Sequence, residues 1–420
     1  MPALWRTFAG RLGLIAAAGL ALRFAYVLLL ARDVVGSGDY HFYHGAANLI
    51  ADGHGFADPF QTIGPGEEAE PSANHPPLWP LVLSLSSLLE VTGQVPHKLV
   101  GCLVGGAVIV AVGILARRIG GERLGAIAAA LAAGYPVLIA ADGALMSETL
   151  YGLFVVGALL AAHELWRRPR ALWAAALGAV IGLAALTRSE GLLLLPVLAA
   201  PIALTSPGRL RVRVGLLAVA CLAALAVIAP WTARNALAFD RFVLISTNDG
   251  SLLAGANCPA SYSGPEMGGW HFDCISKPLP SEDDAERGAR WRREGLQYAS
   301  DHAERLPVVI PVRVLRTWEL YKPRDQVRFA EGRQRDFVRV GIFCYFVLLP
   351  LAVTGFLSLR RRVPAALLLA TPILVTLTSA LGYGMPRLRH AADIGLVLLG
   401  AAGIERLAEL RRRAKAPATA

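Results

Sequence analysis

The sequence predicts an all-α polytopic membrane protein with about ten transmembrane helices, one re-entrant or interfacial helix and a small external loop domain. Hydrophobic residues make up 55% of the 420 residues and charged residues only 17%, which is too apolar a balance for a soluble globule of this size. The formal net charge of +10 falls mostly on Arg residues between the apolar runs, so no partner nucleic acid is expected.

Ten apolar runs approach the roughly 20 residues that a spanning helix needs. They lie at 12–32, 97–116, 124–142, 144–165, 171–187, 190–205, 214–231, 337–359, 363–383 and 391–408. The first run is too long for a secretory signal and lacks a cleavage site, so it is expected to remain as a transmembrane helix. A shorter run at 76–89 opens with two prolines and is expected to be re-entrant or interfacial.

Arginine clusters decide the expected topology. They lie at 117–123, 167–170, 209–213, 360–362 and 411–413. If the run at 76–89 does not cross, all of them share one side with Arg6 and Arg11, and the positive-inside rule makes that side the cytoplasm. Both termini are then cytoplasmic in a multi-pass protein of the cell (plasma or inner) membrane.

This topology divides the chain into three expected units. Residues 1–231 form an N-terminal transmembrane module that contains the external loop 33–96. Residues 232–336 form an external loop domain, and 337–420 form the C-terminal helices with a basic cytoplasmic tail.

Cys258 and Cys274 share the long external loop without the companion ligands of a zinc site. In an oxidising compartment they are expected to form a disulfide. The Trp residues of this loop indicate a folded insert, in which Ser281 is the expected N-cap of a surface helix.

The stretch "GSGDYHFYHGAANLIADGHGF" at 36–56 places a carboxylate at the edge of the membrane. Asp39 is a candidate general base, because partial desolvation is expected to raise its pKa. The alternative is that Asp39 only caps a helix at 40–51. Tyr40 and Tyr43 are candidate substrate-binding residues beside it.

The stretch "EPSANHPPLWP" presents Asn74 and His75 just before a Pro-Pro pair that holds the chain extended. Both are candidate substrate-binding residues, although a lone His is more often a structural hydrogen-bonding group.

Two further places hold ionisable residues facing outward. Arg387 and Arg389 in "YGMPRLRH" break the positive-inside rule, so either a phosphate ester or acids of the long loop must compensate them. Glu148 opens an outward helix end, and Arg188 and Glu190 lie in a tight turn near membrane depth. Such residues are functional candidates, although Arg188 and Glu190 could simply pair with each other.

Together, a carboxylate base and a cationic phosphate site beside lipid-facing helices favour group transfer from a lipid-linked phosphate donor. The base would take the proton of an acceptor hydroxyl, and the cation would stabilise the departing phosphate.

The order of several motifs resembles a known family. These are "GDYHFYHGAANLIADGHGF", "HPPLWPLVLSL", "MSETLYGLFVVGALL", "LTRSEGLLLLP", "PWTARN" and "YGMPRLRHAADIGLVLLGAAGI". Their order and spacing over about 1–240 and the closing helix resemble the GT-C glycosyltransferases, in the branch of the protein O-mannosyltransferases and the lipid A aminoarabinose transferase.

The resemblance implies a GT-C-like fold and an inverting transferase that uses a polyprenyl-phosphate-linked sugar at the external face. It implies Asp39 as catalytic base, Glu148 as a second catalytic-site acid, and Arg387 or Arg389 as the ligand of the donor phosphate. Arg188, as an ionisable residue near membrane depth, is a further candidate for binding the donor phosphate. The acceptor would be a glycan, a lipid or a protein, and membrane lipids surround the enzyme.

The chain departs from this family at Tyr40, where many members carry a second acid after the first Asp. No cofactor is therefore expected. Asp39, His75 and Glu148 could supply ligands to a divalent metal, but their spacing is not diagnostic and an obligatory metal is not expected.

Two other classes of function compete with a transferase. A transporter or flippase of a lipid-linked sugar would use the same phosphate site without a base, and it would show repeated halves or broken helices near the midplane. A structural subunit of an envelope complex would leave Asp39 dispensable.

Overall fold

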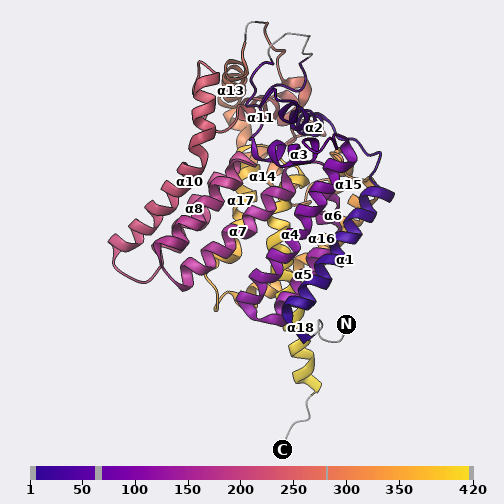
Figure 1. Cartoon of the computed structure of the whole chain (residues 1–420), viewed down its shortest axis with the longest axis vertical. Helices are drawn as coiled ribbons and strands as arrows, with labels where there is room; N and C mark the ends of the chain where they lie inside the picture. Colours follow the sequence, from indigo (N-terminus) through magenta and orange to yellow (C-terminus); the bar gives the residue numbers. More distant parts are fainter. Residues whose placement is uncertain (1–5, 62–68, 281, 416–420) are drawn as a thin grey trace, which may run out of the picture.

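The computed structural model describes residues 6–61, 69–280 and 282–415. Over these residues it is built from helices, with one isolated β-bridge between Ala57 and Pro71, so the predicted all-α class is confirmed. In Figure 1, α1 (Phe8–Leu29) begins and α18 (His390–Lys415) ends at the lower end of the bundle. The helices of the two expected external loops gather at the upper end.

Within the described ranges, five helices are long and apolar enough to cross a membrane. They are α1, α4 (Gln94–Gly120), α7 (Glu148–Arg167), α10 (Leu210–Ala238) and α16 (Arg335–Leu359). The pair α5 (Glu122–Gly134) and α6 (Pro136–Asp142) makes a sixth if its two parts count as one span. Shorter helices in the bundle are α8 (Ala171–Ala185) and α17 (Ala365–Leu381). The multi-pass architecture is confirmed, whereas the count of ten spans is not.

Two of the expected spans contain prolines and depart from a regular α-helix. The run at 124–142 bends by 59° between α5 and α6, where Pro136 cannot donate a backbone hydrogen bond. The run at 190–205 forms one apolar helix, Ser189–Leu204, whose hydrogen-bond pattern changes along its length. It passes from the 3₁₀ segment η2 (Ser189–Leu193) to the π-helical segment η3 (Leu195–Ala199) and the α-helical segment α9 (Ala200–Leu204), with Pro196 and Pro201 inside it.

The run at 76–89 forms the short helix α3 (Leu78–Ser87), which packs against α2 (Gly38–Ala51) at the upper end of the bundle. Its ten residues span about 15 Å, roughly half the thickness of a bilayer core. Trp79 and Leu83 are fully buried in a cluster with residues of α2. The geometry therefore fits an interfacial or re-entrant helix.

A buried ion pair joins α1 to the last residue of α6. The Arg23 guanidinium donates to the carboxylate of Asp142 at 2.5 Å and to the carbonyl oxygens of Gly19, Ala132 and Ala133 at 3.0–3.1 Å. Arg23 is completely buried, and Asp142 neutralises its charge inside the bundle.

The external insert is built around α11 (Asn248–Ala256) and α13 (Asp284–Asp301), which pack against each other. Its other helices are α12 (Pro259–Tyr262), α14 (Leu306–Thr317) and α15 (Pro323–Gln326), with the 3₁₀ turns η4 (Phe272–Cys274), η5 (Ala303–Arg305) and η6 (Val327–Phe329). Ser281 lies outside the described residues, and the N-cap of α13 is Asp283, which forms a capping box with Glu286.

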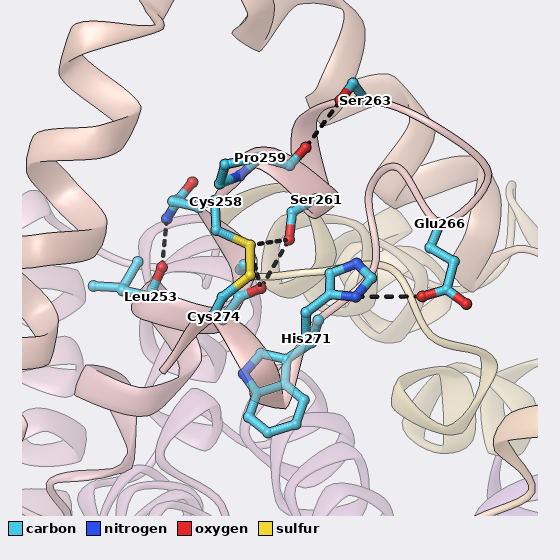
Figure 2. Close-up of a disulfide and its surroundings, with 12 residues drawn as sticks. Leu253, Cys258, Pro259, Ser261, Ser263, Glu266, His271 and Cys274 are labelled. Carbon is cyan, nitrogen blue, oxygen red and sulfur yellow. Dashed lines mark hydrogen bonds and ion pairs between the residues drawn. A yellow bond between two sulfur atoms is a disulfide. The ribbon is translucent and has the colours of Figure 1, made fainter. Parts of the chain in front are cut away.

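Cys258 and Cys274 are joined by a disulfide, as the sequence predicts (Figure 2). The disulfide closes a loop over α12 and η4.

Candidate active site

Three candidate residues from distant parts of the chain meet at the upper end of the bundle. Asp39 lies in the first turn of α2, His75 in the loop before α3, and Arg387 in the 3₁₀ turn η7 (Pro386–Arg389) that precedes α18. Arg387 Nη2 donates to Asp39 Oδ2 at 2.9 Å, and His75 Nε2 lies 3.6 Å from Asp39 Oδ1. The fold therefore brings the proposed base and the proposed phosphate ligand into direct contact.

The pKa of Asp39 is lower than the sequence led us to expect. Burial alone would raise the pKa of this carboxyl group, but the charge and hydrogen bond of Arg387, with His75 and Arg188 nearby, lower it to about 2. The expected rise is therefore wrong, because the sequence does not show which cations lie next to Asp39. The N-cap of α2 is Ser37, so capping is not the function of Asp39 either.

The turn before Asp39 is held by a buried cation. Lys98 of α4 is fully buried, and its ammonium group donates to the carbonyl oxygens of Ala31, Arg32 and Val34 at 2.7–3.2 Å. These carbonyls follow the end of α1, where no further helical turn can satisfy them. Lys98 therefore fixes the chain that leads into α2 and to Asp39.

Glu148 and Arg188 form the deeper part of the same cluster. Glu148 is the first residue of α7 and only 1% exposed, and its carboxylate lies 3.2 Å from Arg188 and 4.0 Å from Arg387. Arg188 also donates to Glu190 at 2.6 Å and to Ser147 at 3.3 Å. Arg188 and Glu190 do pair with each other, which was the alternative to a functional role. Arg188 also contacts Glu148, so both residues are connected to the site.

His75 is held by hydrogen-bonding and aromatic neighbours. Its Nδ1 lies 3.3 Å from the hydroxyl of Tyr43 and 3.4 Å from the amide nitrogen of Asn248, and the ring of Phe42 packs beside it. Burial lowers the pKa of His75, although Asp39 opposes this shift. A neutral His75 beside Asp39 at neutral pH follows.

Two of the predicted substrate-binding residues lie elsewhere. Tyr40 is fully buried and donates to Gln94 at 3.0 Å, so its side chain is part of the core under α2. The backbone of Asn74 donates to Ser72, and within the described residues no contact joins its side chain to Asp39. We predicted that both residues lie beside Asp39 at the site, but neither contacts the cluster of charges.

Arg389 is a buried cation that lines one pocket with Arg387 and is matched by acids of the chain. It is 2% exposed, it donates to Asp393 at 3.1 Å, and its guanidinium lies 3.9 Å from Glu319 and 3.7 Å from the centre of the Tyr345 ring. Of the two candidate phosphate ligands, the geometry therefore favours Arg387. The acids that compensate Arg389 lie at the end of α14 and on α18.

Sequence reasoning missed two residues of the site. Arg333 and His390 line one pocket with Arg387. The apolar walls of this pocket include Val137, Ala140 and Ala141 of α6 and Val338 and Ile342 of α16. Arg333 lies 4.0 Å from Glu148. In the sequence, Arg333 stands out only as a basic residue just before a predicted span. His390 directly follows Arg389 in the stretch "YGMPRLRH".

Several buried polar atoms around this pocket have no hydrogen-bond partner among the described residues. They are Arg387 Nε and Nη1, His390 Nδ1 and Nε2, Glu148 Oε2, Glu319 Oε2 and Asp393 Oδ2. Buried donors and acceptors without partners are costly, so such a concentration is typical of a site that binds water or a polar ligand.

We expect the contribution of Glu319 to the stability of the protein to be lost as the pH rises from about 4 to about 7. Burial raises the pKa of Glu319 to about 7, despite Arg389 beside it, so the folded state retains a proton that the unfolded chain has lost. The stabilising contribution is complete below the usual pKa of a Glu, near 4.3, and is lost as the pH passes 7. Chemical unfolding of the unchanged protein and of Glu319→Gln, each measured against pH, isolates this contribution. The variant should lack the loss of stability that Glu319 causes over this pH range, and an unchanged slope would contradict the assignment.

No group of three or more His, Cys, Asp or Glu side chains in residues 6–61, 69–280 and 282–415 is arranged to hold a metal ion. Whether the protein needs a metal therefore stays a prediction.

Comparisons with known proteins agree with this architecture. Residues 74–233 match the family model for dolichyl-phosphate-mannose-protein mannosyltransferase. The oligosaccharyltransferase of Archaeoglobus fulgidus in its apo form superposes over 97% of this chain with a TM-score of 0.58 at 16% identity. The chain has a GT-C fold.

A second structure with the GT-C fold is that of A. fulgidus AglB with an inhibitory peptide and a dolichol-phosphate, which covers 98% of this chain with a TM-score of 0.59 at 16% identity. The chain spans about half the length of these oligosaccharyltransferases, 52% in both cases. ArnT from Cupriavidus metallidurans, bound to undecaprenyl phosphate, aligns over 95% of this chain and 79% of its own, at 17% identity and a TM-score of 0.47. No curated protein sequence matches the chain.

Proposed function

We propose that this protein is a membrane glycosyltransferase. It transfers a sugar from a polyprenyl-phosphate-linked donor to an acceptor hydroxyl at the external face of the membrane, with inversion at the anomeric carbon. The observation that carries this proposal is the contact between the carboxylate of Asp39 and the guanidinium of Arg387, which lines a pocket with apolar walls. The match to a mannosyltransferase family model and the dolichol-phosphate bound to AglB support it.

Arg387 is the proposed ligand of the donor phosphate. Two of its guanidinium nitrogens, Nε and Nη1, are buried and lack hydrogen-bond partners among the described residues, whereas Nη2 donates to Asp39. A phosphate oxygen would satisfy the free nitrogens with charge-assisted hydrogen bonds. One guanidinium then places the leaving phosphate close to the base. His390 and Arg333 line the same pocket and offer further donors.

Donor binding also explains how so weak a base could act. The pKa of Asp39 is low mainly because Arg387 offsets the effect of burial. A phosphate bound to Arg387 would neutralise that charge and raise the pKa of Asp39, so the carboxylate becomes a stronger base once the donor is present. The acceptor oxygen then attacks the anomeric carbon, its proton passes to Asp39, and the bond from carbon to the phosphate oxygen breaks to release polyprenyl phosphate.

The polyprenyl chain is proposed to leave the pocket between α6 and α16. Both helices contribute aliphatic side chains to the pocket wall. The acceptor would approach Asp39 from the side of His75, where Asn248 belongs to the external insert. A glycan, a lipid or a protein could supply the hydroxyl.

The proposal is tested by offering the purified protein a panel of polyprenyl-phosphate monosaccharides with an envelope extract as acceptor, and measuring released polyprenyl phosphate. Arg387→Gln is expected to weaken binding of undecaprenyl phosphate about 10- to 100-fold, because a charge-assisted hydrogen-bonding group is lost. Arg292→Gln removes an exposed partner of Asp249 in the external insert and serves as the matched control. Binding without release from any donor would instead favour a transporter, and unchanged binding by Arg387→Gln would contradict the phosphate site.

A further inference from the structure

The disulfide-closed loop 258–274 lies against the segment that carries Arg387. Inside the loop, Gly268 donates through its backbone to the carbonyl of Ser261 at 2.8 Å. Ser261 Oγ donates to the carbonyl of Gly255 in α11 at 2.8 Å. His271 Nδ1 lies 3.3 Å from the Glu266 carboxylate (Figure 2). The disulfide thus closes a compact loop with its own hydrogen bonds and ion pair.

Arg316 holds this loop to α14, because it donates to the carbonyl of Met267 at 2.6 Å and to that of Pro265 at 3.1 Å. Arg313 of the same helix donates to the carbonyl of Ala256 at 2.6 Å, at the end of α11 just before the loop. Arg313 and Arg316 are each only 3% exposed. A buried guanidinium needs its acceptors, so the loop cannot move away from α14 without leaving donors unsatisfied.

The loop also contacts residues 383 and 384, which lie just before η7. The amide of Gly384 donates to the carbonyl of Gly268 at 2.8 Å, and the rings of Trp270 and Tyr383 lie 6.4 Å apart. A Cβ atom at Gly384 would lie 2.3 Å from the carbonyl oxygen of Arg313, so only glycine allows this approach. The loop, α14 and the segment before η7 are therefore packed backbone against backbone.

Tyr383 completes the connection to the site. Arg387 Nη2 donates to the Tyr383 hydroxyl at 3.2 Å, and the same nitrogen donates to Asp39. The position of this guanidinium is thus defined by one contact to the base and one contact to the segment that the loop holds in place.

We propose that the disulfide-closed loop 258–274 is a positioning element for Arg387, acting through Gly384 and Tyr383. The inference rests on the proposed function for its consequence, because a correctly placed Arg387 matters only if it binds the donor phosphate. Opening the disulfide should release residues 383–387, lower the affinity for the donor and leave the transmembrane bundle folded. An oxidising compartment would then be a condition for full donor affinity.

The first experiment opens the loop by the double change Cys258→Ser and Cys274→Ser, with Cys221→Ser as the matched control because Cys221 is a free cysteine of α10. Hydrogen–deuterium exchange should become faster at the Gly384 amide and at 383–388 in the double variant only. Binding of undecaprenyl phosphate should weaken about tenfold. Unchanged exchange at 383–388, or unchanged binding despite faster exchange, would overturn the proposal.

Tyr383→Phe tests the last contact without touching the disulfide. The ring stays, so we expect the fold to stay, whereas the donor KM should rise several-fold with little change in kcat at saturating donor. A purely structural effect would instead lower the fraction of active protein, and so lower kcat without raising KM. Tyr298→Phe on α13 is the matched control, because it removes a tyrosine hydroxyl and keeps the ring that packs against Tyr262 of the loop. If the unchanged protein does not bind undecaprenyl phosphate, the proposed function fails, and the exchange experiment still decides whether the loop positions residues 383–388.

Discussion

Asp39→Asn is expected to lower the rate of sugar transfer about 100- to 10,000-fold, the usual contribution of a general base. The Asn side chain keeps the shape of Asp and can still accept the hydrogen bond from Arg387 Nη2, so the donor should bind at least as well as before. Release of polyprenyl phosphate and equilibrium binding of the same lipid, measured side by side, separate the two effects.

The matched control for this change is Asp249→Asn. Asp249 also accepts hydrogen bonds from an arginine, Arg292, but the pair is exposed on the external insert. A transfer rate in Asp39→Asn that stays above a tenth of the unchanged protein's would rule out Asp39 as the base. Loss of binding together with transfer would show that Asp39 serves the donor site and not the proton transfer.

Arg23→Met is expected to destabilise the protein by about 3–5 kcal/mol, the largest stability effect of a single change that the structure indicates. The change leaves the carboxylate of Asp142 without its cation, and it leaves the carbonyl oxygens of Ala132 and Ala133 without their donor. Unfolding in a graded series of denaturing detergent would measure the loss.

A double variant separates the charge from the packing. Arg23→Met with Asp142→Asn removes both charges and should recover a large part of the lost stability, because no buried charge is then unpaired. Arg11→Gln is the control, since Arg11 pairs with Glu122 at the exposed end of the same helix and should change stability by less than about 1 kcal/mol. If the double variant is as unstable as Arg23→Met alone, the unpaired charge is not the cause.

Much of the helical architecture could be predicted from composition, because a long apolar run in a membrane protein has few alternatives to a helix. The runs at 97–116 and 337–359 correspond to α4 and α16. The irregular hydrogen bonding of the run at 190–205 could not be predicted, since Pro is tolerated in membrane helices whenever neighbours satisfy the freed backbone groups. Only the packed structure shows that the helix Ser189–Leu204 contains the 3₁₀ segment η2 and the π-helical segment η3.

The site was predictable in its members but not in its contacts. Asp39, Glu148 and Arg387 stand out as polar residues at helix ends, and the fold brings them together. The choice between Arg387 and Arg389 depends on a single 3₁₀ turn, which directs one side chain to Asp39 and the other to Asp393. The sign of the Asp39 pKa shift depends on the same contact, and no local pattern contains it.

The pair formed by Arg23 and Asp142 also constrains how the chain is made. Arg23 lies in α1, and its acidic partner follows 119 residues later in the chain. An unpaired arginine inside a membrane helix is costly to insert into a bilayer, by about 2.5–3.5 kcal/mol at the helix centre. During synthesis α1 therefore carries an unpaired cation until α6 supplies Asp142.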